Sequence, residues 1–129
     1  MIAVDTNVLL RFLVQDDPTQ AASAGHLLEN VLTAEEPGFV TIVAVLELDW
    51  VLRSQYSFSA DVVVKTFGQL MSSPNLVFEQ AVALKTALAF EHGDLADNIL
   101  HHVGQANGCA KTLTFGKKFA RLSGVELLK

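Results

Sequence analysis

The sequence has few of the features that stabilise extracellular or membrane proteins. Its single cysteine, Cys109, excludes an intramolecular disulfide, so a cytoplasmic protein is the expectation. No apolar run approaches the roughly 20 residues that a membrane-spanning helix needs. Asp5, Asn7 and Arg11 interrupt the apolar start, so we expect mature structure there and not a signal peptide. The length of 129 residues predicts one domain, residues 1–129, around one core.

Positive charge is also scarce, since the formal net charge is −5. This balance argues against nucleic-acid binding through a broad basic face, which needs clustered Lys and Arg. Five of the nine basic residues fall in the last 19 positions, namely Lys111, Lys117, Lys118, Arg121 and Lys129. Such a run is usually a solvated face, and a local rim that contacts phosphates is the alternative.

Short apolar runs alternate with helical patterns along the chain. The predicted strands are Met1 to Val4, Gly38 to Thr41, Leu76 to Phe78, Ala110 to Phe115 and Val125 to Leu128. Predicted helices cover residues 8–13, 18–32, 42–52, 59–71, about 80–91 and 94–107. His92-Gly93 and Gly108 are predicted to end the last two helices. This order predicts an α/β fold with a three-layer arrangement of about five parallel strands flanked by helices.

Asp5 directly follows the first predicted strand. Open parallel sheets place their functional crevice beyond the carboxyl ends of the strands, so this carboxylate is a candidate site residue. The alternative is that Asp5 only caps the next helix, a position that Asp strongly favours. Thr6 and Asn7 could share the capping role and leave Asp5 directed into the crevice.

Glu47 lies in the apolar segment VAVLELDWVL. Asp49 and Arg53 are spaced i, i+4 and are expected to form a solvated pair, and Glu47 is rotated about 200° from Asp49. We therefore expect Glu47 to face the interior or a cleft, where a carboxylate needs a metal ion or a basic partner. The alternative is a glutamate that emerges at the edge of the helix.

Asp94 and Asp97 share one face at the start of a predicted helix. Asp94 as N-cap with Asp97 at the third helical position is close to a capping box, which explains both without a metal. Together with Asp5 and Glu47 they also form a set of hard oxygen ligands, which Mg²⁺ and Mn²⁺ prefer. His101 and His102 point about 100° apart on a helix, so we assign them a surface or core role.

These motifs together resemble the PIN-domain family, in particular the VapC-type toxins of bacterial toxin–antitoxin pairs. The resemblance rests on Asp5-Thr6-Asn7 after a strand, Glu47 in VLELDWVLRSQY, Asp94 to Asp97 at a helix start, and Thr112 to Phe115 followed by Lys118-Phe119. It covers essentially the whole chain in order, and the DTN start is its most specific motif.

The resemblance implies a Mg²⁺- or Mn²⁺-dependent ribonuclease that cleaves RNA, is usually a homodimer, and is inhibited by a VapB-like antitoxin protein. Matched position by position, Asp5, Glu47 and Asp97 are the metal-binding and catalytic carboxylates. Asp94 matches an auxiliary acid, and Thr6, Asn7 and Thr114 match supporting polar positions. Lys117, Lys118 and Arg121 are candidates for contacts with substrate phosphates or with the acidic groups of a partner.

One departure from the family pattern concerns Gly116. Family members commonly carry an acidic residue directly after the Thr-Phe pair, and its absence leaves one metal ion or two as open alternatives. A catalytically weak or inactive binding module is therefore a competing hypothesis. A phosphoacceptor signalling domain is another, but the strand that ends at Thr41 offers no acceptor Asp.

Overall fold

The computed structural model describes residues 1–90 and 93–129. It divides into two compact units, Met1–Glu79 and Gln80–Lys129, and each is described by itself. The predicted end of the fifth helix at Glu91 and the first residue of its predicted stop signal, His92, lie outside the described residues. The expectation of one domain stays a prediction.

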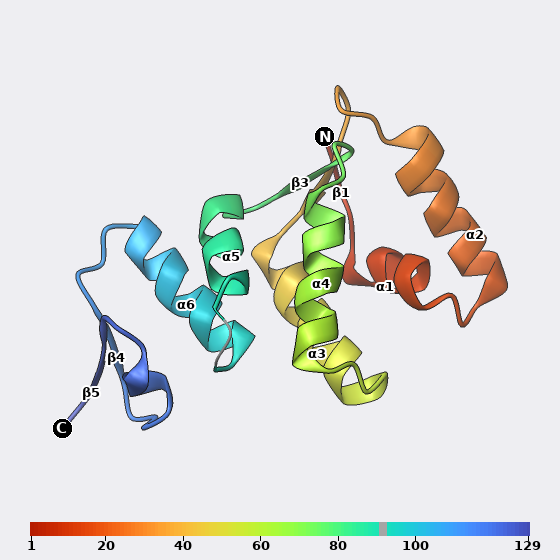
Figure 1. Cartoon of the computed structure of the whole chain (residues 1–129). Helices are drawn as coiled ribbons and strands as arrows, with labels where there is room; N and C mark the ends of the chain where they lie inside the picture. The colour runs from red at the N-terminus through yellow and green to blue at the C-terminus, as the bar shows by residue number, and fades with distance from the viewer. Residues whose placement is uncertain (91–92) are drawn as a thin grey trace. The chain divides into compact units, whose positions relative to one another are not determined.

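The first unit is built on a parallel three-stranded sheet (Figure 1). Its strands are β1 (Ile2–Ala3), β2 (Gly38–Val40) and β3 (Leu76–Phe78), in the order β1-β2-β3. Gly38 begins β2 where a Cβ would lie 2.8 Å from side-chain atoms of both Leu32 and Val4, so a larger residue would force these side chains to shift. Because the strands are parallel, Asp5, Thr41 and Glu79 follow them at the same edge of the sheet.

Helices flank this sheet and bury its core. They are α1 (Thr6–Val14), α2 (Pro18–His26), the π-helical η1 (Leu27–Val31), α3 (Ile42–Gln55) and α4 (Ala60–Met71). Asp17 and Ser59 cap α2 and α4, because their side chains accept hydrogen bonds from the backbone N–H groups of Gln20 and Val62. Asp and Ser are among the residues preferred at N-caps. Side chains with almost no exposure form the core, among them Leu9, Val40, Val45, Leu48, Leu52, Val63 and Phe67.

The second unit contains α5 (Ala81–Leu88), α6 (Leu95–Ala106), β4 (Thr112–Thr114), η2 (Phe119–Arg121) and β5 (Val125–Leu127). Strands β4 and β5 pair in parallel, with Thr112 opposite Val125. All five predicted strands are therefore present, three in the first unit and two in the second. The α/β class with parallel strands flanked by helices is confirmed.

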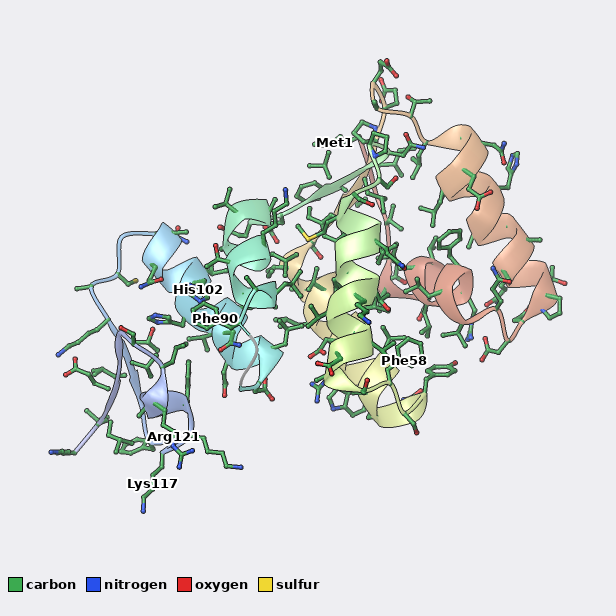
Figure 2. The ribbon with its side chains drawn as sticks, in the orientation of Figure 1. Met1, Phe58, Phe90, His102, Lys117 and Arg121 are labelled. Carbon is green, nitrogen blue, oxygen red and sulfur yellow. The ribbon has the colours of Figure 1, made fainter. Side chains whose placement is uncertain are left out.

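Two histidines of α6 are buried within the second unit, and one of them, His101, connects the helix to β4. His101 Nδ1 lies 2.8 Å from Thr112 Oγ1, and His102 Nδ1 lies 3.1 Å from Gln105 Oε1. The ring of Phe90 packs 4.9 Å from that of His102 (Figure 2). Of the two roles predicted for this pair, the core role is the observed one.

No helix within residues 1–90 and 93–129 combines the length and apolar character that crossing a membrane requires.

Candidate active site

Asp5 lies between β1 and α1, directly before the helix. It has extended backbone angles, and its carboxylate accepts the Thr6 N–H at 2.8 Å, so Asp5 is the N-cap of α1. The capping alternative is thus observed, and Thr6 and Asn7 do not take that role. Among the contacts within residues 1–90 and 93–129, only Oδ1 of the Asp5 carboxylate accepts a hydrogen bond, which leaves Oδ2 able to bind a ligand.

Thr6 links the first carboxylate to a second one from a distant segment. Its hydroxyl donates to Glu47 Oε2 at 3.2 Å, across 41 positions of sequence, while its backbone N–H binds Asp5. Thr6 is itself only 5% exposed, so its position is fixed by packing. Two acidic groups are therefore gathered around one buried threonine at the carboxyl end of β1.

The predicted orientation of α3 is wrong in one respect. Glu47 is exposed, whereas Asp49 is the carboxylate that is buried, with 2% exposure. The core face of α3 contains Val45 and Leu48, and Asp49 lies one turn beyond Val45 on that face. Arg53 compensates the buried charge with two hydrogen bonds of 2.9 and 2.8 Å, so the expected pair forms but is not solvated on its acidic side.

The start of α6 carries the other acidic pair. Asp94 is the N-cap and accepts the Asp97 N–H at 3.2 Å, which confirms the predicted capping arrangement. Asp97 is half-buried, and burial together with the nearby Asp94 charge raises the pKa of its carboxyl. A bound cation would offset both effects.

The candidate ligands are divided between the two units. Asp5 and Glu47 belong to the first, and Asp94 and Asp97 to the second. Within the described ranges, no group of three or more His, Cys, Asp or Glu residues is arranged to hold a metal ion. Each unit nevertheless contributes a pair of hard oxygen ligands, and Mg²⁺ is commonly held by one or two carboxylates with several waters. The chemistry of these donors fits that ion, and their meeting at one site stays a prediction.

The segment after β4 contains the remaining candidates. Thr114 Oγ1 accepts the Gly116 N–H at 2.9 Å and so shapes the turn. A Cβ at Gly116 would lie 3.4 Å from that hydroxyl and 3.7 Å from Phe119 Cβ, which are ordinary van der Waals contacts. Beyond the turn, Lys117, Lys118 and Arg121 are exposed, and Figure 2 shows Lys117 and Arg121 extending outward from this segment.

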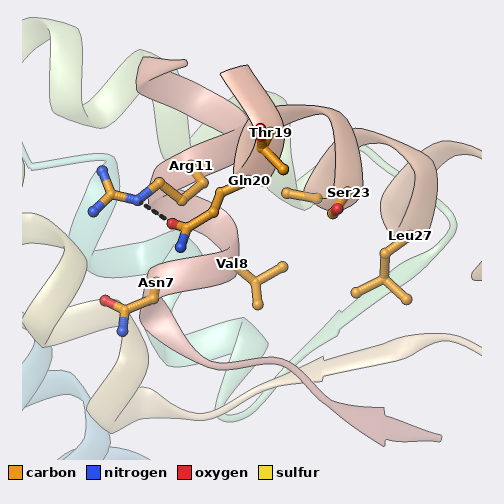
Figure 3. Close-up of a pocket in the computed structure, with 8 residues that line it drawn as sticks. Asn7, Val8, Arg11, Thr19, Gln20, Ser23 and Leu27 are labelled. Carbon is orange, nitrogen blue, oxygen red and sulfur yellow. Dashed lines mark hydrogen bonds between the residues drawn. The ribbon is translucent and has the colours of Figure 1, made fainter. Parts of the chain in front are cut away.

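A pocket between α1 and α2 is a feature that the sequence analysis missed (Figure 3). Its volume is about 510 Å³, and it is lined by Asn7, Val8, Arg11, Thr19, Gln20, Ser23, Ala24 and Leu27. Arg11 is held at its edge by Gln20 at 2.9 Å and Asp16 at 2.7 Å, and Asp16 also accepts the Tyr56 hydroxyl at 2.8 Å. Hydrogen bonds from Tyr56 and Arg11 lower the pKa of Asp16. Asn7 therefore lines the same pocket as Arg11 and Gln20, which belong to this hydrogen-bonded network.

Glu79 is a second feature that was missed. Its carboxylate accepts the Ile42 N–H at 2.7 Å, so it caps the start of α3 together with Thr41, which accepts the Ala44 N–H at 3.1 Å. Glu79 therefore ties the helix that bears Glu47 to the end of β3. Its place directly after a strand, like that of Asp5, is the sequence signal that could have identified it.

Comparisons with known proteins fit this arrangement of acidic residues at strand and helix ends. A comparison with curated protein sequences gives no match to this chain. The model of the PIN domain family matches residues 2–125. Because this match spans nearly the whole sequence, the chain belongs to the PIN-domain family, whose members are generally metal-dependent nucleases.

Proposed function

We propose that this protein is a Mg²⁺- or Mn²⁺-dependent endoribonuclease of the VapC toxin type. The observation that carries the proposal is the pair of Thr6 contacts that gathers Asp5 and Glu47 at the carboxyl end of β1. Parallel sheets present their functional groups at this edge. Family membership supports the nuclease class, and the sequence resemblance supports the toxin type.

We assign the metal ligands to Asp5 and Asp97, with Asp94 as an auxiliary acid. When bound, the divalent ion would neutralise charge on the phosphodiester and activate water. The raised pKa of the Asp97 carboxyl supports the assignment, because a cation would stabilise its ionised form. One open oxygen on Asp5 supports it as well.

Glu47 acts on the attacking water in this proposal. Its exposed carboxylate orients that water and accepts a hydrogen bond from it, while Thr6 fixes the rotamer of the glutamate. Asn7 and Thr114 are assigned supporting polar roles. The exposed side chains of Lys117, Lys118 and Arg121 contact phosphates that flank the scissile bond, or acidic groups of a partner.

The proposed partners follow from the toxin type. They are an RNA substrate, a VapB-like antitoxin protein and a second copy of the chain. Several apolar side chains are exposed, among them Trp50 and Val82, and these supply surface for such contacts.

Substitution of Asp5 tests the proposal. Asp5→Asn should abolish metal-dependent cleavage of RNA, because the amide is a poor ligand for a hard cation. The helix should remain capped, since Asn and Asp are equivalent there. The matched control is Asp17→Asn, which alters the capping carboxylate of α2 and should retain activity. Cleavage by Asp5→Asn at the rate of the unmodified protein would refute the assignment.

A catalytically inactive PIN-like binding module is the second candidate, and Gly116 favours it. Family membership gives no support to the phosphoacceptor alternative. A Cβ at Gly116 makes only ordinary van der Waals contacts, so Gly116→Asp is a suitable variant to restore the family's acidic residue. Ribonuclease activity and manganese binding are measured for the unmodified protein and for Gly116→Asp. Activity that appears only in the variant would establish that the unmodified protein is a binding module.

A further inference from the structure

The exposed face of α3 carries an unusual side chain. Val43, Glu47 and Trp50 are spaced i, i+4 and i+7, so they lie on one side of the helix. Val43 is 59% and Trp50 58% exposed, although a large aromatic side chain is normally mostly buried. The opposite side of α3 packs in the core through Val45, Leu48 and Leu52. The stripe formed by Val43, Glu47 and Trp50 takes no part in this packing.

We infer that Trp50 is a stacking platform for an unpaired nucleobase of a single-stranded RNA substrate. This inference rests on the proposed function, because it takes Glu47 as part of the site that receives the scissile phosphate. Glu47 and Trp50 are three residues apart, which corresponds to about 4.5 Å along the helix axis. Stacked bases of one strand are about 3.4 Å apart, a spacing similar to this one, so a base near the scissile phosphate can reach the indole.

The surroundings of Trp50 favour this occupant. Indole faces stack on any base, which gives affinity without requiring a basic surface, and the chain is acidic overall. The helix beneath the indole is held in place by the packing of Val45, Leu48 and Leu52 in the core. The platform therefore lies on a rigid element beside the proposed reaction site.

A second copy of the chain suits the same stripe less well. A two-fold interface centred on this face would bring equivalent residues together. It would then bury Glu47 of both copies between the Val43 and Trp50 side chains of the two chains. The stripe itself contains no basic residue that could compensate these buried charges. Glu47 beside Trp50 is compatible with a nucleotide strand, because its carboxylate remains available to water and metal.

Trp50 is the only tryptophan in the sequence, so its fluorescence reports directly on stacking. Single-stranded hexauridylate and hexaadenylate are titrated into the unmodified protein in buffer with EDTA, which prevents metal-dependent cleavage. We expect saturable quenching of Trp50 emission by the single strands and much weaker quenching by a blunt duplex of the same length.

Anisotropy of fluorescein-labelled oligonucleotides then measures affinity for substituted proteins. Trp50→Leu, which keeps apolar bulk but removes the ring, should bind about 5- to 150-fold more weakly. Trp50→Phe should retain most of the affinity. The matched control is Val62→Ala, which truncates an exposed apolar side chain on α4 and should bind as the unmodified protein does. Circular dichroism verifies that each variant is folded.

Three outcomes would overturn the inference. The first is anisotropy that saturates while Trp50 emission stays constant, and the second is no binding of either oligonucleotide. The third is a set of results that would assign the face to a second copy of the chain. In this case Trp50 emission would shift with protein concentration alone, and sedimentation would show a dimer that Trp50→Leu abolishes. The same substitution would leave the affinity for RNA unchanged. These binding measurements involve no cleavage, so failure of the proposed catalytic role in the Asp5→Asn test would be seen separately.

Discussion

The hydrogen bond from Thr6 to Glu47 offers a direct test of how the proposed active site is positioned. Thr6→Val removes the hydroxyl and keeps a side chain of similar shape in a site that is 5% exposed. A hydrogen bond to a charged group contributes about 1.5–3 kcal/mol, but Glu47 is exposed, so water replaces part of the interaction. We therefore expect a loss of about 1 kcal/mol, which corresponds to a roughly fivefold lower rate of the chemical step.

The assay is cleavage of a labelled RNA at saturating manganese, in which steady-state rates give kcat and KM and single-turnover rates isolate the chemical step. Thr6→Val should lower kcat about fivefold and change KM little, because the interaction acts on orientation and not on substrate binding. Thr6→Ser keeps the hydroxyl and is expected to stay within about twofold of the unmodified protein. Unchanged kcat in Thr6→Val, or an equal loss in Thr6→Ser, would show that the hydroxyl does not orient Glu47.

Three further predictions concern stability. Arg53→Met leaves the Asp49 carboxylate buried without its partner and should cost about 3 kcal/mol in urea unfolding, whereas the double variant with Asp49→Leu should be nearly neutral. Burial, then the neighbouring His102, lowers the pKa of His101 in the folded state. As the pH falls below about 6.5, the unfolded state therefore binds a proton before the folded state does, and the free energy of unfolding decreases. His101→Gln should reduce this pH dependence. The control His26→Gln, at an exposed position, should leave it unchanged. Glu79→Gln removes a charged cap from α3 and should cost about 1 kcal/mol by thermal unfolding, and no change would show that Thr41 suffices.

Local signals in the sequence predicted the elements well. Asp17 before Pro18, Ser59 and Asp94 each mark a helix start, and the structure has an N-cap at all three acidic or hydroxyl residues. These caps depend only on neighbouring backbone groups, so they can be read without knowledge of the fold. The π-helical turn Leu27–Val31 has no such signal and was predicted as ordinary helix.

The orientation of α3 could not be predicted from its own sequence. Apolar residues occupy almost every side of this helix, so its periodicity does not identify which face packs in the core. The buried position of Asp49 depends on the bidentate contact with Arg53, and the exposure of Trp50 depends on what packs against α3. Both are properties of tertiary packing, and an argument from angular spacing alone wrongly predicted that Asp49 is solvated.

Capping and ligation are not exclusive roles for an acidic residue, and the structure indicates how they can be told apart. Asp5, Asp17 and Asp94 all cap helices through nearby backbone N–H groups, Asp5 through the next residue and the other two through the residue three positions ahead. Of these three caps, and within the residues that the structure describes, only that of Asp5 is coupled, through the buried Thr6, to a carboxylate 41 positions away from that threonine. A cap that serves helix stability alone has no need of this connection, since its partners are backbone groups one to three residues ahead. The long-range contact, and not the residue type, therefore makes Asp5 the stronger candidate and Asp17 its proper control.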